Sequence, residues 1–456
     1  FAYLDGPAGR LGIVDVPGHE RFVRQMIAGA AGIDWVMLIV AADEGVMPQT
    51  LEHLDICTLL GVRRGAVVLT KTDLVDDEWL ELVADDVQSN VAGTFLEGAP
   101  ILHFTASKPE SSVQLGEAIH RLIDQEVFVE RSDDRPFKLS IDRVFTMRGF
   151  GTVVTGTSAS GELKVGDPVQ VLPQEEEARV RGIQVHGAAV EKVSPGTRAA
   201  INIQGIDHDA VHRGDVLTDS GGLIQTTSFD GHLTALKRLS KPIKDRSKVL
   251  VHVGTAQIQG KVILIGAESL EPGDSCAVQV RLDHPTAILP GEPFVIRGFE
   301  VFESYGKTLG GGVAMTPSLR PLRRRSSDGA ALVKGLGATE DAFIVQAFAD
   351  FVGGEGFSQK DLAARLPLTR QRIRATLDEL IESGELIGSA KALFPKSHIE
   401  ATRQLAISQL ESFHKTNPAR RGMAQEELKS RLGAHIPSDV FGLLLNDLVS
   451  GDKVVR

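Results

Sequence analysis

The fold is decided by the stretch Leu11-Gly12-Ile13-Val14-Asp15-Val16-Pro17-Gly18-His19. It begins as a short apolar strand that ends at the carboxylate of Asp15, and then it turns through Pro17 and Gly18 to His19. The turn-forming residues 5–9 precede it, so we expect residues 11–14 to be the second arm of a β-hairpin. A helix is expected after His19, because apolar residues then recur at helical spacing: Phe22, Val23, Met26 and Ile27.

Strands and helices alternate through the next hundred residues. The run 35–40 is continuously apolar, as expected of a strand buried on both faces of a parallel sheet, and 66–69 and 101–104 are similar. Amphipathic helices are expected over 49–60, 77–88 and 113–124. This alternation predicts a doubly wound α/β domain over residues 1–133.

The texture changes after Arg135-Pro136. Short β-branched runs punctuated by Gly and Pro, such as 150–156 and 249–253, predict two successive β-barrels over residues 134–228 and 229–322. The connector that follows, 317–329, contains the basic cluster Arg323-Arg324-Arg325.

The last part of the chain contains a diverged internal repeat. Residues 358–366 resemble residues 424–432, and each copy is followed by a turn, a helix (370–382 and 437–449) and a Ser-Gly pair. Helix, turn, helix and a strand-like tail such as 385–388 predict winged helices over 323–395 and 396–456. The second copy stops where its wing should begin.

Composition narrows the class of protein. Residues 1–133 carry 9 Lys or Arg against 22 Asp or Glu, whereas the rest carries 40 against 38, so the acidity belongs to the first domain and the rest could carry basic faces. Two cysteines far apart, Cys57 and Cys276, make a disulfide framework improbable. No apolar run reaches membrane-spanning length and no leader begins the chain, so we expect a cytoplasmic protein without a membrane partner.

The residue types around the opening stretch suit a nucleoside triphosphate. Asp15 at a strand end can hold Mg²⁺ through water, because Mg²⁺ keeps part of its hydration shell. Gly18 after Pro17 lets a backbone N–H approach a γ-phosphate, and His19 can orient an attacking water. The alternative is a plain hairpin-to-helix turn with a structural histidine.

Two further turns follow predicted parallel strands, at the sheet edge where ligands bind: Thr70-Lys71-Thr72-Asp73 and Thr105-Ala106-Ser107. The carboxylate of Asp73 can accept hydrogen bonds from N1 and N2 of guanine, a pair that adenine does not offer. The stem of Lys71 can lie over the base, and a backbone N–H of the second turn, at Ala106, can donate to O6. Together the three turns predict a GTP site.

These residues, with 43–53, resemble the translational GTPases. Thr70 stands where most members have Asn, which weakens one contact. The resemblance implies a phosphate loop, Gly-x-x-x-x-Gly-Lys-Ser/Thr, and a switch-I threonine upstream of Phe1; 151–156 and 306–308 are only superficially similar. The expected fold is therefore an α/β P-loop GTPase domain truncated at its N-terminus, two β-barrels and winged-helix modules, and we expect the fragment itself to be inactive as a GTPase.

The second domain narrows the resemblance. Residues 141–156 are similar to the barrel with which elongation factor Tu-type proteins bind the aminoacylated tRNA end, and 179–186, 196–203 and 308–312 resemble the selenocysteine-specific elongation factors. That resemblance implies an aminoacyl pocket of Asp142, Arg143 and Arg198, where cations favour an ionised selenol over the hydroxyl of serine. The alternative is a set of ordinary surface ion pairs.

The winged helices agree with this family. The resemblance implies GTP and Mg²⁺ as cofactors, and selenocysteinyl-tRNA, the ribosome and a selenoprotein mRNA hairpin as partners, with delivery at recoded UGA codons and release on GTP hydrolysis. Arg370, Arg372 and Arg374 could meet RNA phosphates, although a solvated face is the favoured interpretation. The alternatives are another elongation factor Tu-like or initiation-type GTPase, or a winged-helix nucleic-acid-binding protein with a degenerate nucleotide domain.

Overall fold

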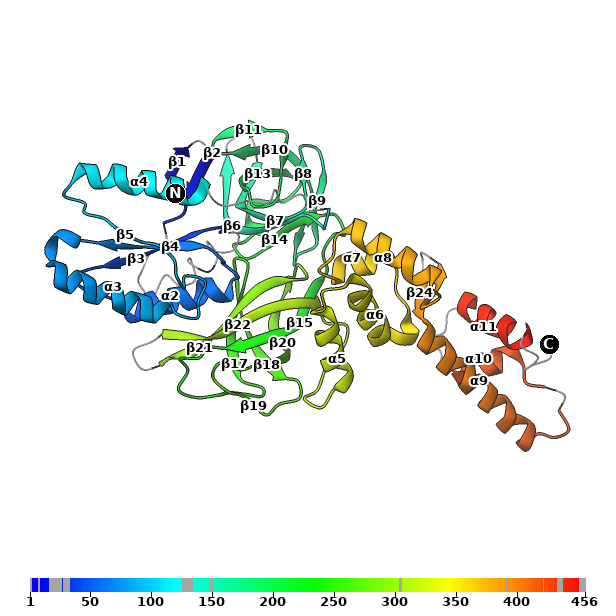
Figure 1. The fold of residues 1–456 in the computed structure, drawn as a ribbon. Coiled ribbons are helices and arrows are strands. Elements are labelled where there is room, and N and C mark those ends of the chain that lie inside the picture. Colours follow the sequence, from blue (N-terminus) through cyan, green and yellow to red (C-terminus); the bar gives the residue numbers. More distant parts are fainter. Residues whose placement is uncertain are drawn as a thin grey trace. The chain divides into compact units, whose positions relative to one another are not determined.

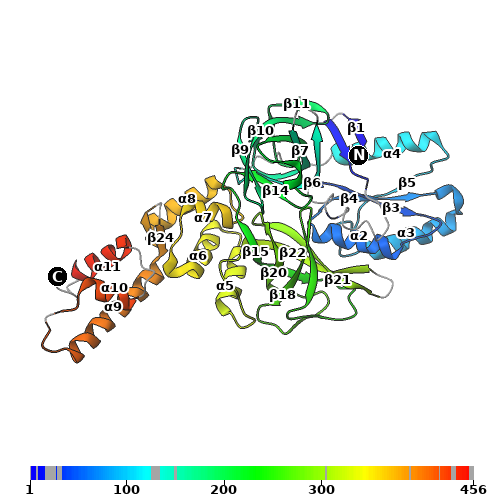
Figure 2. The same ribbon diagram turned by 180° about the vertical axis from the view of Figure 1, so that it is seen from behind.

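The computed structural model describes residues 2–6, 9–15, 27, 33–124, 134–147, 151–302, 306–389, 392–420, 422–432 and 438–450. The chain divides into two compact units, Phe1–Ser326 and Ser327–Arg456. The first unit contains an α/β part and two β-barrels, and the second is mainly helical (Figures 1 and 2). The finer domain boundaries expected from the sequence remain predictions.

The α/β part is built on three parallel strands. They are β3 (Val36–Ala41), β4 (Gly65–Thr70) and β5 (Ile101–His103), in the order β3-β4-β5. Helices α2 (Pro48–Leu59) and α3 (Asp77–Val91) share one apolar cluster with the sheet, which includes Leu54, Leu69 and Val87. Helix α4 (Pro109–Asp124) lies on the other side of the sheet (Figure 1). Helices on both faces confirm the α/β prediction.

The expected hairpin is present at the start of the chain. Strands β1 (Ala2–Gly6) and β2 (Gly9–Ile13) pair antiparallel, with Ala2 opposite Ile13 and Gly6 opposite Gly9. The helix expected after His19 lies outside the described residues, apart from Ile27, which is helical and buried.

The first barrel is a closed ring of six antiparallel strands. They are β6 (Lys138–Met147), β7 (Gly151–Ser160), β9 (Pro168–Leu172), β10 (Glu176–Val185), β13 (Arg198–Gln204) and β14 (Val216–Asp219). The ring runs β9-β10-β13-β7-β6-β14 and closes because β9 pairs with both β14 and β10. The barrel also carries three short strands and a 3-10 turn: β8 (Leu163–Lys164), β11 (Ala188–Val190), β12 (Lys192–Val193) and η3 (His208–Ala210). Alternate residues, such as Leu139, Ile141 and Ile201, fill its interior.

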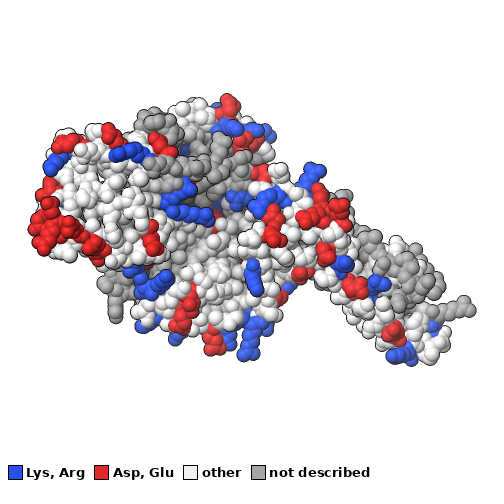
Figure 3. All heavy atoms as spheres, in the orientation of Figure 1, with Lys and Arg blue, Asp and Glu red and all other residues white. Residues whose placement is uncertain are grey.

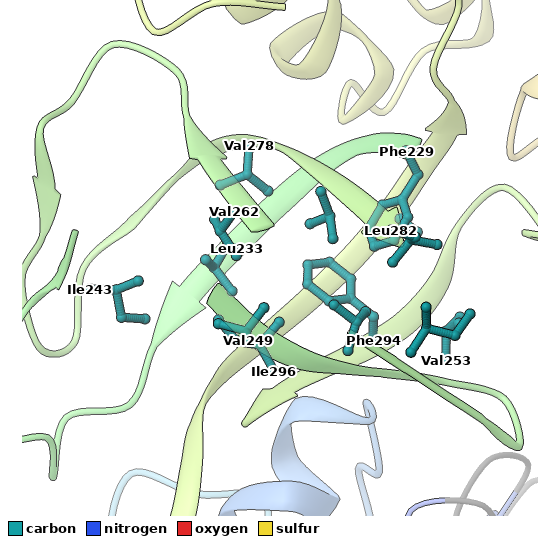
Figure 4. Close-up of a cluster of buried hydrophobic side chains, with 14 of the residues drawn as sticks. Phe229, Leu233, Ile243, Val249, Val253, Val262, Val278, Leu282, Phe294 and Ile296 are labelled. Atoms are coloured by element: carbon teal, nitrogen blue, oxygen red, sulfur yellow. The ribbon is translucent and has the colours of Figure 1, made fainter. Parts of the chain in front are cut away.

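The second barrel also closes, in the order β15-β20-β18-β17-β21-β22. Its strands are β15 (Gln225–Ala235), β17 (Lys248–Val253), β18 (Ala256–Leu264), β20 (Ser275–Ala287), β21 (Glu292–Phe302) and β22 (Gly306–Pro317), with short β16 (Ile243–Lys244) and β19 (Ser269–Leu270). Phe229 and Phe294 meet edge to face at its centre, with ring centroids 5.0 Å apart, surrounded by aliphatic side chains (Figure 4).

Helix α2 packs on β21 and β22 of the second barrel around one buried carboxylate. Oε1 of Glu52, a residue only 1% exposed, accepts hydrogen bonds from Arg297 Nη2 (3.1 Å), from the backbone N–H groups of Lys307 and Thr308, and from the Thr308 hydroxyl (2.6 Å). Gly311 lets the helix approach, because a Cβ there would lie 2.5 Å from a carbonyl and 3.1 Å from Leu59. The α/β part and the second barrel are therefore joined by charge as well as by apolar packing.

The two barrels are joined by a second buried pair. The ammonium of Lys138 on β6 donates to Oε1 of Glu292 at 2.6 Å and to the carbonyl of Ala287 at 3.2 Å. Glu292 also accepts from the backbone N–H of Leu289 at 2.9 Å. Lys138 is 1% exposed and Glu292 9%, so the ion pair lies inside the barrel–barrel interface.

The second unit begins with a winged helix. Its helices are α5 (Ser327–Leu336), α6 (Asp341–Val352), α7 (Gln359–Arg365) and α8 (Arg370–Glu382), and its wing is β23 (Leu386–Ser389) with β24 (Ala392–Pro395); a 3-10 turn, η4, covers Gly353–Glu355. Ser358 begins α7 with a capping box to Asp361, and Thr369 caps α8. Phe348, Phe357 and Phe394 lie in the core. The predicted helix 370–382 is confirmed to the residue.

The repeat is also confirmed in the described residues. Helix α9 (Lys396–Thr416) follows the wing, and α10 (Gln425–Leu432) and α11 (Ser438–Ser450) are the counterparts of α7 and α8. Leu428, Leu444 and Leu448 pack against Ala406 of α9. None of the described helices is both long and apolar enough to cross a membrane.

Candidate functional site

The two turns predicted to read a guanine base lie side by side at the carboxyl ends of β4 and β5. Thr70 ends β4, and Asp73 lies in the short 3-10 turn η2 (Thr72–Leu74) that follows. The hydroxyl of Ser107, from the turn after β5, donates to Oδ2 of Asp73 at 2.8 Å. This bond orients the carboxylate, and Oδ1 takes no hydrogen bond from any residue that the structure describes, so acceptor capacity remains for a ligand.

A buried network below these turns holds them together. The hydroxyls of Thr72 and Thr105 lie 2.7 Å apart, and the backbone N–H of Thr105 donates to the hydroxyl of Ser111 at 2.9 Å. Thr105 and Ser111 are 6% and 8% exposed. Thr105 was expected from the sequence, but the roles of Thr72 and Ser111 were not, because a hydroxyl pair between two turns leaves no periodic signal.

Lys71 directly precedes the short turn that contains Asp73. Its backbone is left-handed (φ 56°), and its ammonium donates to Asp43 Oδ2 at 2.9 Å and to Glu44 Oε1 at 3.0 Å. The hydrogen bond to Asp43, and then the one to Glu44, raises the pKa of Lys71. Both acids belong to the turn after β3, so all three parallel strands contribute to one edge.

The phosphate side of the site is described only in part. Asp15 lies just beyond β2 with its side chain exposed. Pro17, Gly18 and His19 lie outside the described residues. No group of three or more His, Cys, Asp or Glu that could hold a metal ion occurs among the residues described. A hydrated Mg²⁺ needs no such cluster, because it is held by one or two carboxylates, waters and phosphate oxygens.

The first barrel brings together two of the three residues predicted to form an aminoacyl pocket. Asp142 is the extra residue of a β-bulge on β6, since Ile141 pairs with Gly156 and Arg143 pairs with Thr155. Its carboxylate accepts hydrogen bonds from both terminal nitrogens of Arg198, the first residue of β13, with Nη2 at 3.1 Å from Oδ1. The Thr155 hydroxyl adds a bond to Oδ1 at 2.7 Å.

The bulge depends on a glycine. A Cβ on Gly156 would lie 2.3 Å from the carbonyl oxygen of Ser140, so only glycine lets β7 approach β6 beside Asp142. Sequence reasoning identified Asp142 and Arg198 but neither the bulge nor Thr155. The Asp142 and Arg198 side chains are 19% and 28% exposed, so the pair is reachable from solvent.

Arg143 is not part of that pair. It is exposed, and it makes no ion pair with a residue that the structure describes. The three side chains together therefore present one guanidinium that is neutralised by Asp142 and one that is not. A cation free to meet an anionic group is the chemistry expected of a site that selects an ionised side chain.

Charge is distributed unevenly over the first unit. Acidic side chains gather over α3, at the left of Figure 3. The residues that give this helix its charge are Asp77, Glu78, Glu81, Asp85 and Asp86. Part of the acidity expected for the first domain, five of its 22 acidic residues, thus lies on a solvated helix.

In the second unit, Arg372 is engaged within its own module. Its Nε donates to Oδ2 of Asp341 at 2.8 Å, and this hydrogen bond raises its pKa. Arg374 is exposed on the same helix, α8, which also carries the acids Asp378, Glu379 and Glu382. A helix of mixed charge supports the interpretation of a solvated face rather than an RNA-binding one.

Three protein-family models match parts of the chain. They describe the elongation factor Tu GTP binding domain (residues 2–130), elongation factor Tu domain 2 (151–218) and the elongation factor SelB winged helix (407–456).

Curated relatives match over its whole length. The selenocysteine-specific elongation factor of Desulfomicrobium baculatum is 38% identical over 461 residues, which cover 100% of this chain and 71% of the relative. That of Haemophilus influenzae is 26% identical, with 100% and 70% covered. Elongation factor Tu 2 of Streptomyces avermitilis is 32% identical but covers only 66% of this chain and 79% of its own.

Solved structures agree with these relatives. A crystal structure of a bacterial selenocysteine-specific elongation factor, EF-Sec, superposes with a TM-score of 0.76 at 26% identity, and the match covers 98% of this chain and 71% of that one. The fold of an apo elongation factor SelB from Methanococcus maripaludis matches with a TM-score of 0.62 over 70% of this chain and 72% of that one, at 24% identity.

Proposed function

Because this chain belongs to the selenocysteine-specific elongation factors, we propose that it delivers selenocysteinyl-tRNA to the ribosome at recoded UGA codons. The family makes it a translational GTPase that binds a guanine nucleotide. The observation that carries the residue assignment is the meeting of Asp73 and Ser107, from turns on adjacent parallel strands, at the edge where such sheets bind ligands. The proposed location is the cytoplasm, where translation takes place.

In the proposed base site, Asp73 accepts hydrogen bonds from N1 and N2 of guanine. Ser107 holds the carboxylate in orientation, the stem of Lys71 covers one face of the base, and a backbone N–H of the Thr105–Ser107 turn donates to O6. Thr70, which ends β4, takes the place of the Asn found in most translational GTPases. The hydroxyl of Thr70 is 3.4 Å from the carbonyl of Val40, so it supports the turn rather than the base.

The base assignment is tested by exchanging one atom of Asp73. In Asp73→Asn an amide NH₂ group replaces one carboxylate oxygen. This NH₂ group is a donor, so it faces another donor in the 2-amino group of guanine but can donate to the 2-oxo group of xanthine. We expect the preference for GDP over XDP to fall by at least about 100-fold, because one bond is lost and one is repelled. Glu78→Gln, an exposed change on the first turn of α3, is the control. An unchanged preference would remove Asp73 from the site.

On the phosphate side we propose that Asp15 holds Mg²⁺ through water and that Pro17, Gly18 and His19 face the γ-phosphate. Support comes from the sequence motif and from the exposed position of Asp15 after β2. Bound Mg²⁺ would neutralise phosphate charge. His19 would orient the hydrolytic water, so His19→Ala should lower the GTP hydrolysis rate while leaving GDP affinity within about twofold.

In the first barrel we propose that Asp142, Arg143 and Arg198 form the aminoacyl pocket. The two hydrogen bonds that Arg198 donates to Asp142 fix the orientation of its guanidinium, and Arg143 supplies the cation that Asp142 does not neutralise. A selenolate gains from that positive charge, whereas the neutral hydroxyl of a seryl group does not.

The pocket is tested by measuring binding of selenocysteinyl-tRNA and seryl-tRNA to the protein expressed from its complete reading frame. Arg143→Ala with Arg198→Ala should reduce the discrimination between the two by at least about tenfold. Arg179→Ala is the matched control, because Arg179 is an exposed arginine of the same barrel whose side chain, among the described residues, bonds only to the carbonyl of Gly166. Undiminished discrimination in the double variant would overturn the assignment.

The remaining partners are proposed from the family. The ribosome would meet the GTPase part, and winged helices of the second unit's type would bind an mRNA hairpin. The mixed charge of α8 gives no support for placing RNA on Arg370, Arg372 or Arg374.

A further inference from the structure

Trp79 links the start of helix α3 to the turn that follows β3. It lies in the first turn of α3, directly after the guanine-reading turn, and its backbone N–H donates to the capping carboxylate of Asp76 at 2.8 Å. Its indole Nε1–H reaches in the other direction and donates to the carbonyl of Ala42 at 2.9 Å. Ala42 belongs to the turn after β3, so one side chain spans from α3 to a neighbouring strand end.

Ala42 is hydrogen-bonded on both sides, to the end of β4 and to Trp79. Its backbone N–H donates to the carbonyl of Thr70 at 2.9 Å, and its own carbonyl is the acceptor for the indole. A chain of hydrogen bonds thus runs from Thr70 through Ala42 and Trp79 to Asp76, and it bridges the two ends of the segment 71–75. Ala42 is completely buried, so a carbonyl that lost the indole would be left without a partner at a real energetic cost.

The residues next to Ala42 hold Lys71. Asp43 and Glu44 accept hydrogen bonds from its ammonium at 2.9 and 3.0 Å, which restrains the far end of its four-carbon stem. A stem ordered in advance costs less entropy on binding than one that must be ordered by the ligand. The position of the acidic pair, and hence of the stem, depends on where Ala42 is fixed.

We propose that Trp79 is a positioning residue for the guanine nucleotide: through Ala42 it places Asp43 and Glu44, and through them it holds Lys71 ready to cover the base. This inference rests on the proposed base site and adds a residue to it. The proposed role involves no contact between Trp79 and the nucleotide, and it acts on Lys71 rather than on Asp73.

The test uses the protein expressed from its complete reading frame, with GDP and IDP as ligands. Trp79→Phe keeps the ring but removes the N–H, and it should weaken GDP binding about fivefold, the effect of one lost hydrogen bond. IDP lacks the 2-amino group that Asp73 reads. Trp79 acts on the Lys71 stem, which covers the base of either nucleotide. The variant should therefore weaken IDP binding by the same factor and leave the ratio of the GDP and IDP affinities (the GDP/IDP ratio) unchanged.

Two comparisons separate this role from a structural one. Ser107→Ala loosens Asp73 and should lower the GDP/IDP ratio, which Trp79→Phe should not. In an Asp43→Asn, Glu44→Gln background, where the ammonium has lost its charged anchors, Trp79→Phe should cost less than about twofold. Trp35→Phe is the matched control, because Trp35, the chain's other tryptophan, precedes β3 at the opposite end of the strand from the site.

Three results would overturn the inference: parental GDP affinity in Trp79→Phe, a changed GDP/IDP ratio, or the full loss persisting in the background that lacks the acidic pair. A fall in thermal stability alone, without a change in affinity, counts as the first of these. A parent that bound no guanine nucleotide would instead overturn the proposed function, so the two failures are distinguishable.

Discussion

The charged pairs that join the second β-barrel to its neighbours and the charged pair of the proposed pocket in the first barrel lie in opposite environments. In the second barrel the charges of Glu292 and Arg297 are 9% exposed or less, and each is matched by a residue from another part of the unit, Lys138 or Glu52. In the first barrel the pair Asp142–Arg198 is open to solvent, and Arg143 beside it is exposed. The same chemistry thus joins domains where it is buried, and it supplies the proposed aminoacyl pocket where it is exposed.

The reason is the cost of desolvation. A buried ion pair has little net benefit over apolar packing, but loss of one partner leaves a charge without water or counter-charge. An exposed pair loses little when it is broken, because water replaces the partner. The contrast therefore predicts large effects on stability at the buried pairs and small ones at the exposed pair.

The largest effect is expected at Lys138. Lys138→Met leaves the Glu292 carboxylate buried and unpaired, and should lower the free energy of unfolding by about 4 kcal/mol, measured by urea denaturation. Lys192→Met, which breaks the exposed Lys192–Glu162 pair of the first barrel, should change it by no more than about 0.5 kcal/mol. Adding Glu292→Leu to Lys138→Met should recover most of the loss, and no recovery would mean that packing, not charge, dominates the interface.

Glu52 should follow. Glu52→Ala leaves the Arg297 guanidinium and the Thr308 hydroxyl and N–H without their shared acceptor, and we expect a loss of about 3 kcal/mol. The loss should appear as earlier proteolysis of the α/β part with rising urea concentration. Gln49→Ala, an exposed change on the same helix, is the control. Equal behaviour of the two variants would contradict a role for Glu52 in joining α2 to the barrel.

Asp230 of the second barrel gives a pH-dependent case. Burial raises its pKa to about 6, although hydrogen bonds from Gln279 and Ser318 act in the opposite direction. The folded state binds the carboxyl proton of Asp230 more tightly than the unfolded state does. Ionisation of Asp230 therefore destabilises the folded state, and this free-energy cost is absent below about pH 4 and fully present above about pH 6. Asp230→Asn should therefore gain about 2 kcal/mol relative to the parent between pH 4 and pH 7. A pH-independent difference between the two proteins would show that Asp230 ionises normally.

The smallest effect on stability is expected at the exposed pair. Asp142→Asn should lower the free energy of unfolding by less than about 1 kcal/mol, because Arg198 can turn to water. The same change frees Arg198 from its orienting carboxylate, so discrimination between selenocysteinyl- and seryl-tRNA should change while folding does not. A loss of stability as large as that of Glu52→Ala would erase the distinction between the barrels.

Local patterns predicted the secondary structure well. The strand runs ending at Val40 and Leu69 and the helix 370–382 follow from hydrophobic periodicity, which depends on neighbours within a few residues. The meeting of the Asp73 and Ser107 turns was also predictable, because parallel strands end at one edge of a sheet.

Other features could not be predicted, because their partners lie far along the chain. Glu52 lies within residues 43–53, which carry part of the family resemblance, yet its hydrogen-bond donors are Arg297, Lys307 and Thr308 of the second barrel. The bulge at Asp142 is a matter of register between β6 and β7, and an extra residue in one strand leaves no mark in either strand alone.

By itself, then, the sequence determined the order of the elements and the family to which the chain belongs, and it supplied the residues proposed to read a guanine base. The tertiary structure alone decided which charges are buried and which stay available. It pairs Lys138 with Glu292 and Glu52 with Arg297 out of water, leaves Arg143 exposed, and lets Trp79 reach Ala42. The physical reason is that the effect of a charge or a hydrogen bond depends on its burial and its partner, which arise only when distant segments pack together.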